Sequence, residues 1–359
     1  MKRLLIYGAN GYTGKLIVAE AVRLQLNLIV AGRNADRIRE VANRYSLESR
    51  TFELDAVADQ LGDVSVVLNC AGPYSATAIQ FMDACINSGV HYVDLSGEIS
   101  VLQYAQSRHQ DAGNNHCVLY PGAGMMVPTD CMALMLQRRL PDAEQLTIAF
   151  NFGTRPSIGT LLTVIEGIKQ GGLIRENHQL KKVPTAYRIR RYAFMDSARW
   201  CATIPWTDVY ANQFSTGIPN CQVYVAMPLA MAVMLRATSL LSPILAYDRP
   251  QKWLKWMAQR VFPGGPSPAA RACEHTQFFG SAMNRAGKTV SIQVSGTNVY
   301  ELSPVCAVSV ARQCLAKSGV KGFQTPATLL GGMAILDGGH FDVRTSWNPA
   351  ENRASPQSS

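Results

Sequence analysis

The chain has 359 residues, which is enough for two domains of ordinary size and for a large buried core. Hydrophobic residues make up 47% and charged residues only 16%, so a disordered or fibrous chain is excluded. The net charge of +9 favours anionic partners such as nucleic acid, anionic lipid or phosphorylated ligands. The low charged fraction also indicates that a partner subunit, a lipid or a large apolar ligand covers part of the surface.

Nine cysteines are scattered along the chain, with no C-x-x-C pair and no His/Cys cluster at metal-ligand spacing. We therefore expect reduced, mostly buried thiols in a cytoplasmic protein, and no metal site. The apolar run at 4–7 ends at Gly8, too soon for the roughly 7–15 apolar residues of a signal peptide. A buried first strand explains this run better.

The first 140 residues alternate short β-branched runs with stretches of helical spacing. The expected strands, buried on both faces, are 4–7, 26–31, 64–69, 90–95 and 117–120. The expected helices are 14–24, 35–45, 77–88 and 98–112, with Asn34 as an N-cap and Gly89 as a C-cap. This alternation predicts an α/β fold, a Rossmann-type doubly wound parallel sheet, in a domain over 1–140.

The pattern changes after residue 140. Strands expected at 146–152, 187–192, 276–279 and 289–294, with a glycine-rich helical region at 153–172, predict an α+β second domain over 141–300. A long helix at 303–317 belongs to a C-terminal segment over 301–345. The polar tail at 346–359 contains Pro349 and Pro356, and we expect it to be disordered.

The most apolar stretch runs from 223 to 235 and resumes after Arg236 as far as Tyr247. It is shorter than the about 20 residues needed to span a bilayer, and Pro228 interrupts it. The favoured interpretation is a buried helix or one facing a second subunit. Peripheral membrane contact through 223–260 is the alternative, because tryptophans and cations alternate after it: Arg249, Lys252, Trp253, Lys255, Trp256 and Arg260.

A glycine-rich turn, G-A-N-G-Y-T-G, follows the first strand and opens the first helix. Such glycines let the backbone turn tightly and approach a pyrophosphate, whose charge then lies at the helix N-terminus. The alternative is a turn that merely packs the helix on the strand. The residues expected to bind a dinucleotide here are Gly8, Asn10, Gly11, Tyr12, Thr13 and Gly14.

The end of the second strand discriminates between NAD and NADP. NAD sites usually carry an acidic residue there, whereas this chain has Arg33 followed by Asn34. A guanidinium can pair with the 2′-phosphate and lie over the adenine, so NADP is favoured. Asp36 is expected to lie in the first turn of the following helix, where an acidic residue interacts favourably with the helix dipole. Asp55, placed after a third strand, is expected either to contact the adenine amine or to be a turn residue.

Loops at the carboxyl ends of parallel strands form the site in such sheets. Ala71, Gly72, Pro73 and Tyr74 end the strand at 64–69 and are expected beside the nicotinamide, with Tyr74 as a wall, a proton donor or a packing residue. In the next strand, alternation puts Tyr92 and Asp94 on one face.

A reduction by a nicotinamide cofactor requires a proton as well as a hydride. Glu98 or Tyr74 is expected to donate it, with Asp94 as a further candidate. Glu98 has a second interpretation, as an acid in the first turn of its own helix. Asp130 is expected to be an acid near a helix N-terminus.

Cations and tyrosines alternate along a presumed strand of the second domain: Lys181, Lys182, Tyr187, Arg188, Arg190, Arg191 and Tyr192. This is either a solvated sheet face or a docking site for an acidic partner such as an acyl carrier protein. Nucleic acid is disfavoured, because no reading motif accompanies the charge.

With these residues placed, the chain resembles the saccharopine dehydrogenase-like oxidoreductases, especially the trans-acting enoyl reductase branch. The motifs follow the family's order to about residue 337: the turn at 8–14, AGR at 31–33, NCAGPY at 69–74, HYVDLSGE at 91–98, PGAG at 121–124, PTD at 128–130, GGPSP at 264–268, YELS at 300–303 and TPA at 325–327. The chain departs from the family at Met125-Met126, where Phe-Asp is frequent, and at Ser303-Pro304, where Thr-Ala is usual. Both departures lie where substrate or domain contacts are expected.

The resemblance implies a catalytic α+β domain inserted after the Rossmann domain, and a C-terminal segment that packs back on the Rossmann domain. It implies an NADPH-dependent reductase acting on a C=C bond of a hydrophobic or carrier-bound enoyl thioester. The alternatives are an imine reductase of saccharopine type and a non-catalytic NADP-sensing or scaffold protein. We expect the protein to be a homodimer.

Overall fold

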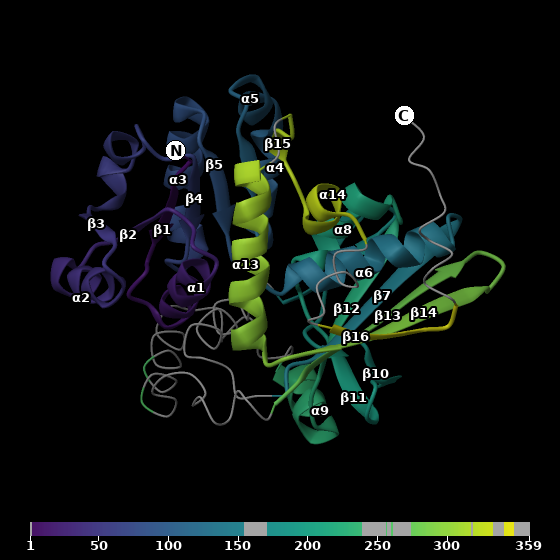
Figure 1. Cartoon of the computed structure of the whole chain (residues 1–359). Coiled ribbons are helices and arrows are strands. Elements are labelled where there is room, and N and C mark those ends of the chain that lie inside the picture. Colours follow the sequence, from purple (N-terminus) through teal and green to yellow (C-terminus); the bar gives the residue numbers. More distant parts are fainter. Residues whose placement is uncertain are drawn as a thin grey trace. The chain divides into compact units, whose positions relative to one another are not determined.

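The computed structural model describes residues 2–153, 171–238, 256, 260, 274–316, 319–332 and 341–347. The chain divides into two compact units (Figure 1). Unit 1 consists of Met1–Val127 and Tyr300–Leu330, and unit 2 consists of Pro128–Val299 and Gly331–Ser359. The last part of the chain therefore contributes to both units.

Unit 1 contains a seven-stranded parallel sheet in the order β15-β6-β5-β4-β1-β2-β3. Its strands are β1 (Leu4–Tyr7), β2 (Leu28–Gly32), β3 (Glu48–Thr51), β4 (Val66–Asn69), β5 (His91–Asp94), β6 (Val118–Tyr120) and β15 (Gly322–Phe323). The strand order reverses between β1 and β4, which confirms the doubly wound sheet. Ligands of such sheets bind at this switch point, outside the carboxyl ends of the strands.

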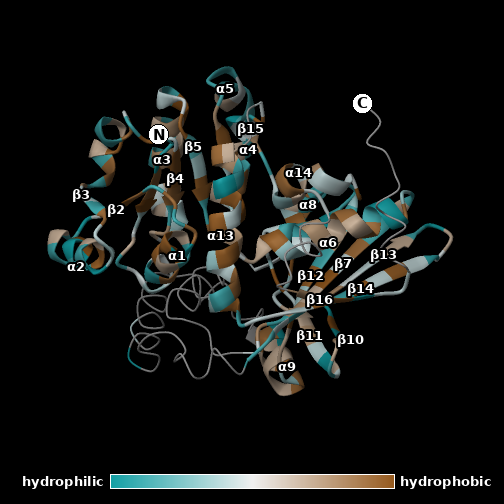
Figure 2. Cartoon of the chain, viewed as in Figure 1, coloured by the Kyte–Doolittle hydropathy of each residue, from teal (hydrophilic) through white to brown (hydrophobic). Residues whose placement is uncertain are grey.

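The central strands β1 and β4 are fully buried, because side chains on both sides of the sheet are covered. The helices of this part of the chain are α1 (Tyr12–Arg23), α2 (Ala35–Tyr45), α3 (Tyr74–Ser88), α4 (Ile99–Ser107), α5 (His109–Asn114), α13 (Val299–Ala316) and α14 (Pro326–Leu330). Figure 2 shows apolar residues along the strands and hydrophilic residues on the outer surface of α2.

Two of the predicted caps are confirmed. The Asn34 side chain accepts a hydrogen bond from the Arg37 amide at 3.0 Å, and Gly89 ends α3 in the left-handed conformation with φ +65°. The single helix expected over 98–112 is wrong, because the chain leaves helical geometry at Arg108, which ends α4 and precedes α5.

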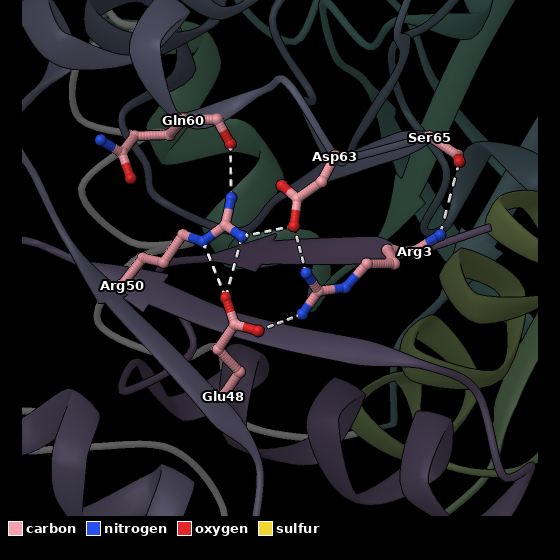
Figure 3. Close-up of polar contacts among 6 residues, drawn as sticks. All are labelled: Arg3, Glu48, Arg50, Gln60, Asp63 and Ser65. Atoms are coloured by element: carbon pink, nitrogen blue, oxygen red, sulfur yellow. Dashed lines mark hydrogen bonds and ion pairs between the residues drawn. The ribbon is translucent and has the colours of Figure 1, made fainter. Parts of the chain in front are cut away.

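The amino ends of three strands are joined by an ion-pair network (Figure 3). Arg3, just before β1, bonds to both Glu48 at the start of β3 and Asp63 before β4. Arg50 donates to Glu48 Oε1 at 2.8 and 3.0 Å, to Asp63 Oδ2 at 2.8 Å and to the Gln60 carbonyl at 2.7 Å. Mainly because of the bond from Arg50, the pKa of Asp63 falls from 3.8 to about 2.

Unit 2 is built on a nine-stranded mixed sheet, as expected for an α+β domain. The main path is β10-β11-β12-β7-β13-β14-β16, with β8 and β9 attached beside β12. The strands are β7 (Ala143–Asn151), β8 (Gly172–Glu176), β9 (Gln179–Val183), β10 (Ile189–Ala193), β11 (Ala198–Thr203), β12 (Asn220–Ala226), β13 (Thr276–Asn284), β14 (Thr289–Gly296) and β16 (Phe341–Thr345).

Three described helices accompany this sheet: α6 (Met126–Arg139), α8 (Asp208–Thr216) and α9 (Leu229–Thr238). Helix α6 lies so close to β13 that a Cβ at Gly280 would be 2.8 Å from Met132 Cε and 2.9 Å from Leu136 Cδ1. The absence of a side chain at Gly280 therefore sets the distance between α6 and the sheet.

A buried polar cluster lies between α8 and the neighbouring strands. The Arg175 guanidinium is 1% exposed and donates to the Val209 and Ile218 carbonyls and to Asn212 Oδ1, at 2.6 to 2.9 Å. Asp208 is fully buried, and its burial, followed by the charge of Asp130, raises its pKa to about 7. A hydrogen bond with Thr129 and the Arg175 charge act in the opposite direction.

Two assignments along the chain need correction. Helix α13 and helix α14 belong to unit 1, but β16 pairs antiparallel with β14, so the end of the 301–345 segment joins the second sheet. The apolar stretch after 223 begins as strand β12 and becomes helical only at Leu229. Pro228 separates the two elements, since proline lacks the N–H that continues either one.

Other expectations fall outside the described residues. These are most of the helical region at 153–172, most of the tail at 346–359, and Arg249, Lys252 and Lys255. Of the aromatic and basic residues expected near 253–260, Trp256 is 51% exposed and the Arg260 guanidinium lies 4.7 Å from its ring centroid.

Cysteines, metal-binding groups and membrane-spanning helices can be examined in the described part of the chain. Every cysteine there is a free thiol, and burial raises the pKa of Cys221 to about 11. Within the same residues, no helix has both the length and the apolar character needed to cross a membrane. The described His, Cys, Asp and Glu side chains form no group able to hold a metal ion.

Candidate dinucleotide site at the carboxyl ends of the unit 1 strands

The turn between β1 and α1 is tightly packed at its first and last glycines. Gly8 has φ +79°, and a Cβ there would lie 2.9 Å from the Ala71 amide nitrogen; a Cβ at Gly14 would lie 2.2 Å from the Gly8 carbonyl oxygen. Gly11, the N-cap of α1, is exposed and has only the Gly8 oxygen within 4 Å of its Cβ position, at 3.2 Å. Side chains at 8 and 14 would disrupt the turn, whereas one at 11 would point toward a ligand.

The first turn of α1 contains no acidic residue. The positive end of the helix dipole therefore has no compensating carboxylate in this turn. This arrangement fits the pyrophosphate of a dinucleotide. Tyr12, on the same turn, is 37% exposed, and its ring lies edge-on against Tyr300 at 5.4 Å.

The end of β2 places an exposed cation next to this turn. A Cβ at Gly32 would meet Asn10 Oδ1 at 3.1 Å, so Gly32 allows the Asn10 side chain to lie against β2. Arg33 is exposed, and no carboxylate of the described residues lies within ion-pair distance of it. Asp36, the nearby acid, pairs with Arg39 at 3.1 Å. Arg33 is therefore available for a 2′-phosphate.

Two other residues assigned to the cofactor have clear structural settings. Asn34 caps α2, as described above. Asp55 is exposed in a short 3-10 helix, Leu54–Ala56, and its contact with adenine stays a prediction.

The loop after β4 is fixed by side chains at its two ends. Asn69 Oδ1 accepts a hydrogen bond from the Ala71 amide at 3.0 Å, and the Thr77 hydroxyl donates to the Ala71 carbonyl at 2.7 Å. A cis peptide bond joins Gly72 to Pro73, and α3 begins at the next residue, Tyr74. Both Gly72 and Pro73 are exposed, so the backbone of this loop is open to a ligand.

Asp94 is the centre of a buried network at the carboxyl end of β5. The Tyr92 hydroxyl donates to Oδ2 at 2.8 Å, and the amides of Ser96 and Gly122 donate to Oδ1 at 2.8 and 2.9 Å. Asn69 Nδ2 donates to the Tyr92 hydroxyl at 3.3 Å. Burial raises the pKa of Asp94, while these hydrogen bonds oppose the rise. The carboxylate is 0% exposed and ties together the loops after β4, β5 and β6.

Glu98 bonds to the start of a different helix. Its Oε1 accepts from the Tyr74 amide at 3.1 Å and its Oε2 from the Ser75 amide at 2.5 Å, so it holds the N-terminus of α3. It precedes α4 but makes no side-chain capping bond to it. The interpretation of Glu98 as an acid of its own helix is therefore wrong, because its carboxylate satisfies the free amides of the neighbouring helix.

Tyr74 is partly buried against the core of unit 1. Burial, and then the negative charges of Asp94 and Glu98, raise the pKa of its hydroxyl well above the usual value. A hydrogen bond with the Leu95 backbone acts in the opposite direction. The phenol therefore keeps its proton at neutral pH.

Sequence patterns gave no role to Asn69 or Thr77 and placed Tyr92 only by its face. Asn69 carried a local signal, since it is a polar residue that ends β4 next to a glycine-containing loop. Thr77 lies on α3 and Tyr92 within β5, so their bonds to Asn69 join different elements and have no local signal.

The turn after β1, the free Arg33 and the doubly wound sheet define a dinucleotide-binding domain of the Rossmann type. Residues 4–118 match the family described as saccharopine dehydrogenase NADP binding domain. The cofactor of this domain is accordingly NADP, as Arg33 predicted.

Curated relatives of the same kind match over part of their length. The chain is 25% identical over 191 residues to human saccharopine dehydrogenase-like oxidoreductase, covering 46% of this chain and 41% of that protein. It is 29% identical over 151 residues to trans-acting enoyl reductase of Mycobacterium leprae, covering 38% and 36%. The matches thus span less than half the length of these relatives.

The whole chain shares its fold with a solved saccharopine dehydrogenase. The L-Glu-forming enzyme of Saccharomyces cerevisiae superposes with a TM-score of 0.64 at 10% identity, over 97% of this chain and 100% of that one. Both units therefore follow the saccharopine dehydrogenase fold.

Proposed function

We propose that the protein is an NADPH-dependent reductase that adds hydrogen across the C=C bond of a hydrophobic or carrier-bound enoyl thioester. The observation that carries this proposal is the joint placement of an NADP-type turn and the Tyr74–Glu98–Asp94 group at the carboxyl ends of neighbouring strands. The similarity to a trans-acting enoyl reductase supports the choice of C=C. Bound NADPH supplies the hydride.

Each residue of this group then has a separate role. The protonated Tyr74 hydroxyl delivers the proton that completes the reduction, because a saturated product needs one proton for each hydride. Glu98 is a positioning residue that holds Tyr74 through its amide. Asp94 is a positioning residue too, since its buried carboxylate fixes the Ser96 and Gly122 loops.

A carrier-bound substrate requires a surface for the carrier. Lys182, Arg188 and Arg190 are exposed in unit 2, and the described residues provide no ion-pair partner for them. We propose that an acidic carrier such as an acyl carrier protein docks along β9 and β10. Lowering of the apparent affinity by salt is expected for such a contact.

The test is oxidation of NADPH by the full-length protein with two substrate classes in parallel. A medium-chain 2-enoyl thioester should be reduced, and an imine formed from a 2-oxo acid and an amine should not. Gly11→Val serves as the control without a cofactor site. If the protein preferred the imine, the proposed function would change from C=C reduction to imine reduction of saccharopine type. Tight NADPH binding with no oxidation by either substrate would favour an NADP-sensing protein.

A further inference from the structure

Helix α9 of unit 2 is apolar on the side that faces solvent. Its exposed side chains include Leu229, Met231, Val233 and Met234, which are 41%, 47%, 54% and 61% exposed. Its only charged residue is Arg236, in the last turn. Figure 2 shows that most of α9 is coloured as hydrophobic. Surface helices normally carry polar residues on their outer face, and helices that are apolar all round are normally buried. The outer face of α9 therefore requires a partner.

The inner side of α9 is firmly packed, so the exposed row is held in place. Ala232 is fully buried and packs with Ala202 of β11 and with Ala186. Leu235 and Ile189 pack against the same cluster. The helix is thus docked through small residues on one face of the second sheet, and its outer row is a fixed feature of unit 2.

Cations and aromatic rings continue the same sheet face beside the helix. Ile189 pairs with Ala202 under α9, and two residues further along, Arg191 pairs with Trp200. Because side chains alternate along a strand, this second pair lies on the same face as the first. Trp200 is 38% exposed, and the Arg191 guanidinium lies 5.8 Å from the centre of its ring. The Trp200 carbonyl accepts a hydrogen bond from the amide of Met227, just before α9.

A further arginine lies at the end of the helix itself. The Arg236 guanidinium donates to the Tyr187 carbonyl at 3.3 Å and lies 5.9 Å from the Tyr187 ring. We call these residues together the α9 surface: Leu229, Met231, Val233, Met234, Arg191, Trp200 and Arg236.

We propose that the α9 surface binds the surface of an anionic lipid bilayer. An apolar helix face enters the boundary between headgroups and acyl chains, while a neighbouring tryptophan and arginines contact the headgroups and their phosphates. The charge favours this occupant over a second copy of the chain, because a two-fold contact through this face would bury the arginines of both copies in one interface, and the α9 surface contains no carboxylate to pair with them. The proposal is independent of the reductase activity.

Flotation of the full-length protein with vesicles tests it directly. Binding is expected to vesicles made of equal parts phosphatidylcholine and phosphatidylserine, and to be much weaker with phosphatidylcholine alone or at high salt. Met234→Glu should lower the partition coefficient by at least about tenfold, since a charge enters where apolar burial is needed. Arg191→Glu should lower it about fivefold or more on anionic vesicles only.

Two matched variants separate this surface from general effects. Ile79→Glu puts a charge on another exposed apolar position, 41% exposed on α3, and Arg44→Glu reverses an exposed cation on α2; both should float as the unchanged protein does. Equal binding by Met234→Glu and the unchanged protein would overturn the proposal. The proposal would also be overturned if the unchanged protein failed to float and light scattering showed a dimer that Met234→Glu converts to a monomer.

Discussion

A carboxylate oxygen of Glu98 lies 3.1 Å from the backbone nitrogen of Tyr74, so the two residues expected to compete as proton donors are bonded to each other. The second oxygen of Glu98 is bonded as well, to the Ser75 amide. The relationship separates their roles, because Glu98 fixes the helix start on which Tyr74 stands, whereas the Tyr74 hydroxyl retains its proton.

Replacement of Tyr74 and Glu98 should therefore have different kinetic consequences. Tyr74→Phe removes only the hydroxyl, and we expect kcat to fall by about 10²-fold with little change in NADPH affinity. Glu98→Gln keeps one acceptor oxygen but removes a charge that raises the pKa of Tyr74, so the alkaline limb of the rate profile should move to lower pH. Near-normal turnover of Tyr74→Phe would assign proton delivery to another group or to solvent.

The preference for NADPH should depend on Arg33. We expect NADPH to bind at least about tenfold more tightly than NADH, which is within the range of one charged contact with a phosphate. Arg33→Ala should remove most of this preference, and Arg44→Ala, at an exposed position near the end of α2, should leave it intact. Titration of both cofactors by fluorescence measures the ratio, and equal affinities in the unchanged protein would contradict the assignment.

The second and third glycines of the turn, Gly11 and Gly14, should separate binding from folding. Gly11→Val brings a side chain to 3.2 Å from the Gly8 carbonyl oxygen, a milder contact than at Gly14, and it fills the space needed by a pyrophosphate, so we expect a folded protein that has lost NADPH binding. Gly14→Val forces a side chain to within 2.2 Å of the Gly8 carbonyl oxygen, so the melting temperature itself should fall. Thermal unfolding with and without NADPH distinguishes the two outcomes; NADPH stabilisation of Gly11→Val would show that the phosphate site is elsewhere.

Burial of Asp208 predicts a pH dependence of stability. Its pKa is raised from 3.8 to about 7 in the folded protein, so between these values the folded state binds more protons than the unfolded state. Stability contributed by the protonated form is complete below pH 3.8 and declines as the pH rises toward 7. Asp208→Asn should remove this decline, a difference on the order of a few kcal/mol. Urea unfolding from about pH 4 to pH 7 measures it, and parallel curves for both proteins would contradict it.

Asp63, in the ion-pair network at the amino ends of the strands, should make stability change with pH in the opposite direction from Asp208. The pKa of Asp63 is lowered from 3.8 to about 2, so its contribution is present above 3.8 and is lost as the pH falls toward 2. Because its side chain is 46% exposed, we expect Asp63→Asn to cost less than about 1 kcal/mol near neutral pH, and less in high salt. Asp59→Asn, at a nearby exposed position outside the network, is the control in the same denaturation experiment.

Local sequence patterns were enough to predict the local features of the candidate dinucleotide site. The turn at 8–14, the caps at Asn34 and Gly89, and the free Arg33 follow from neighbouring residues, because glycine geometry, capping and strand periodicity act over a few positions. The alternation of strand and helix likewise determined the doubly wound sheet, since each amphipathic or fully apolar segment can be buried in few ways.

Contacts between distant groups, in contrast, became known only from the folded chain. Glu98 bonds to the start of α3 rather than to its own helix, Asn69 reaches Tyr92 on the next strand, and β16 pairs with β14 in the second sheet. The exposure of Met234 on an apolar helix was also hidden, because periodicity does not state which side of a uniformly apolar segment is covered. Such contacts depend on chain crossings and loop paths that bring residues together across long sequence separations, and no local pattern encodes them.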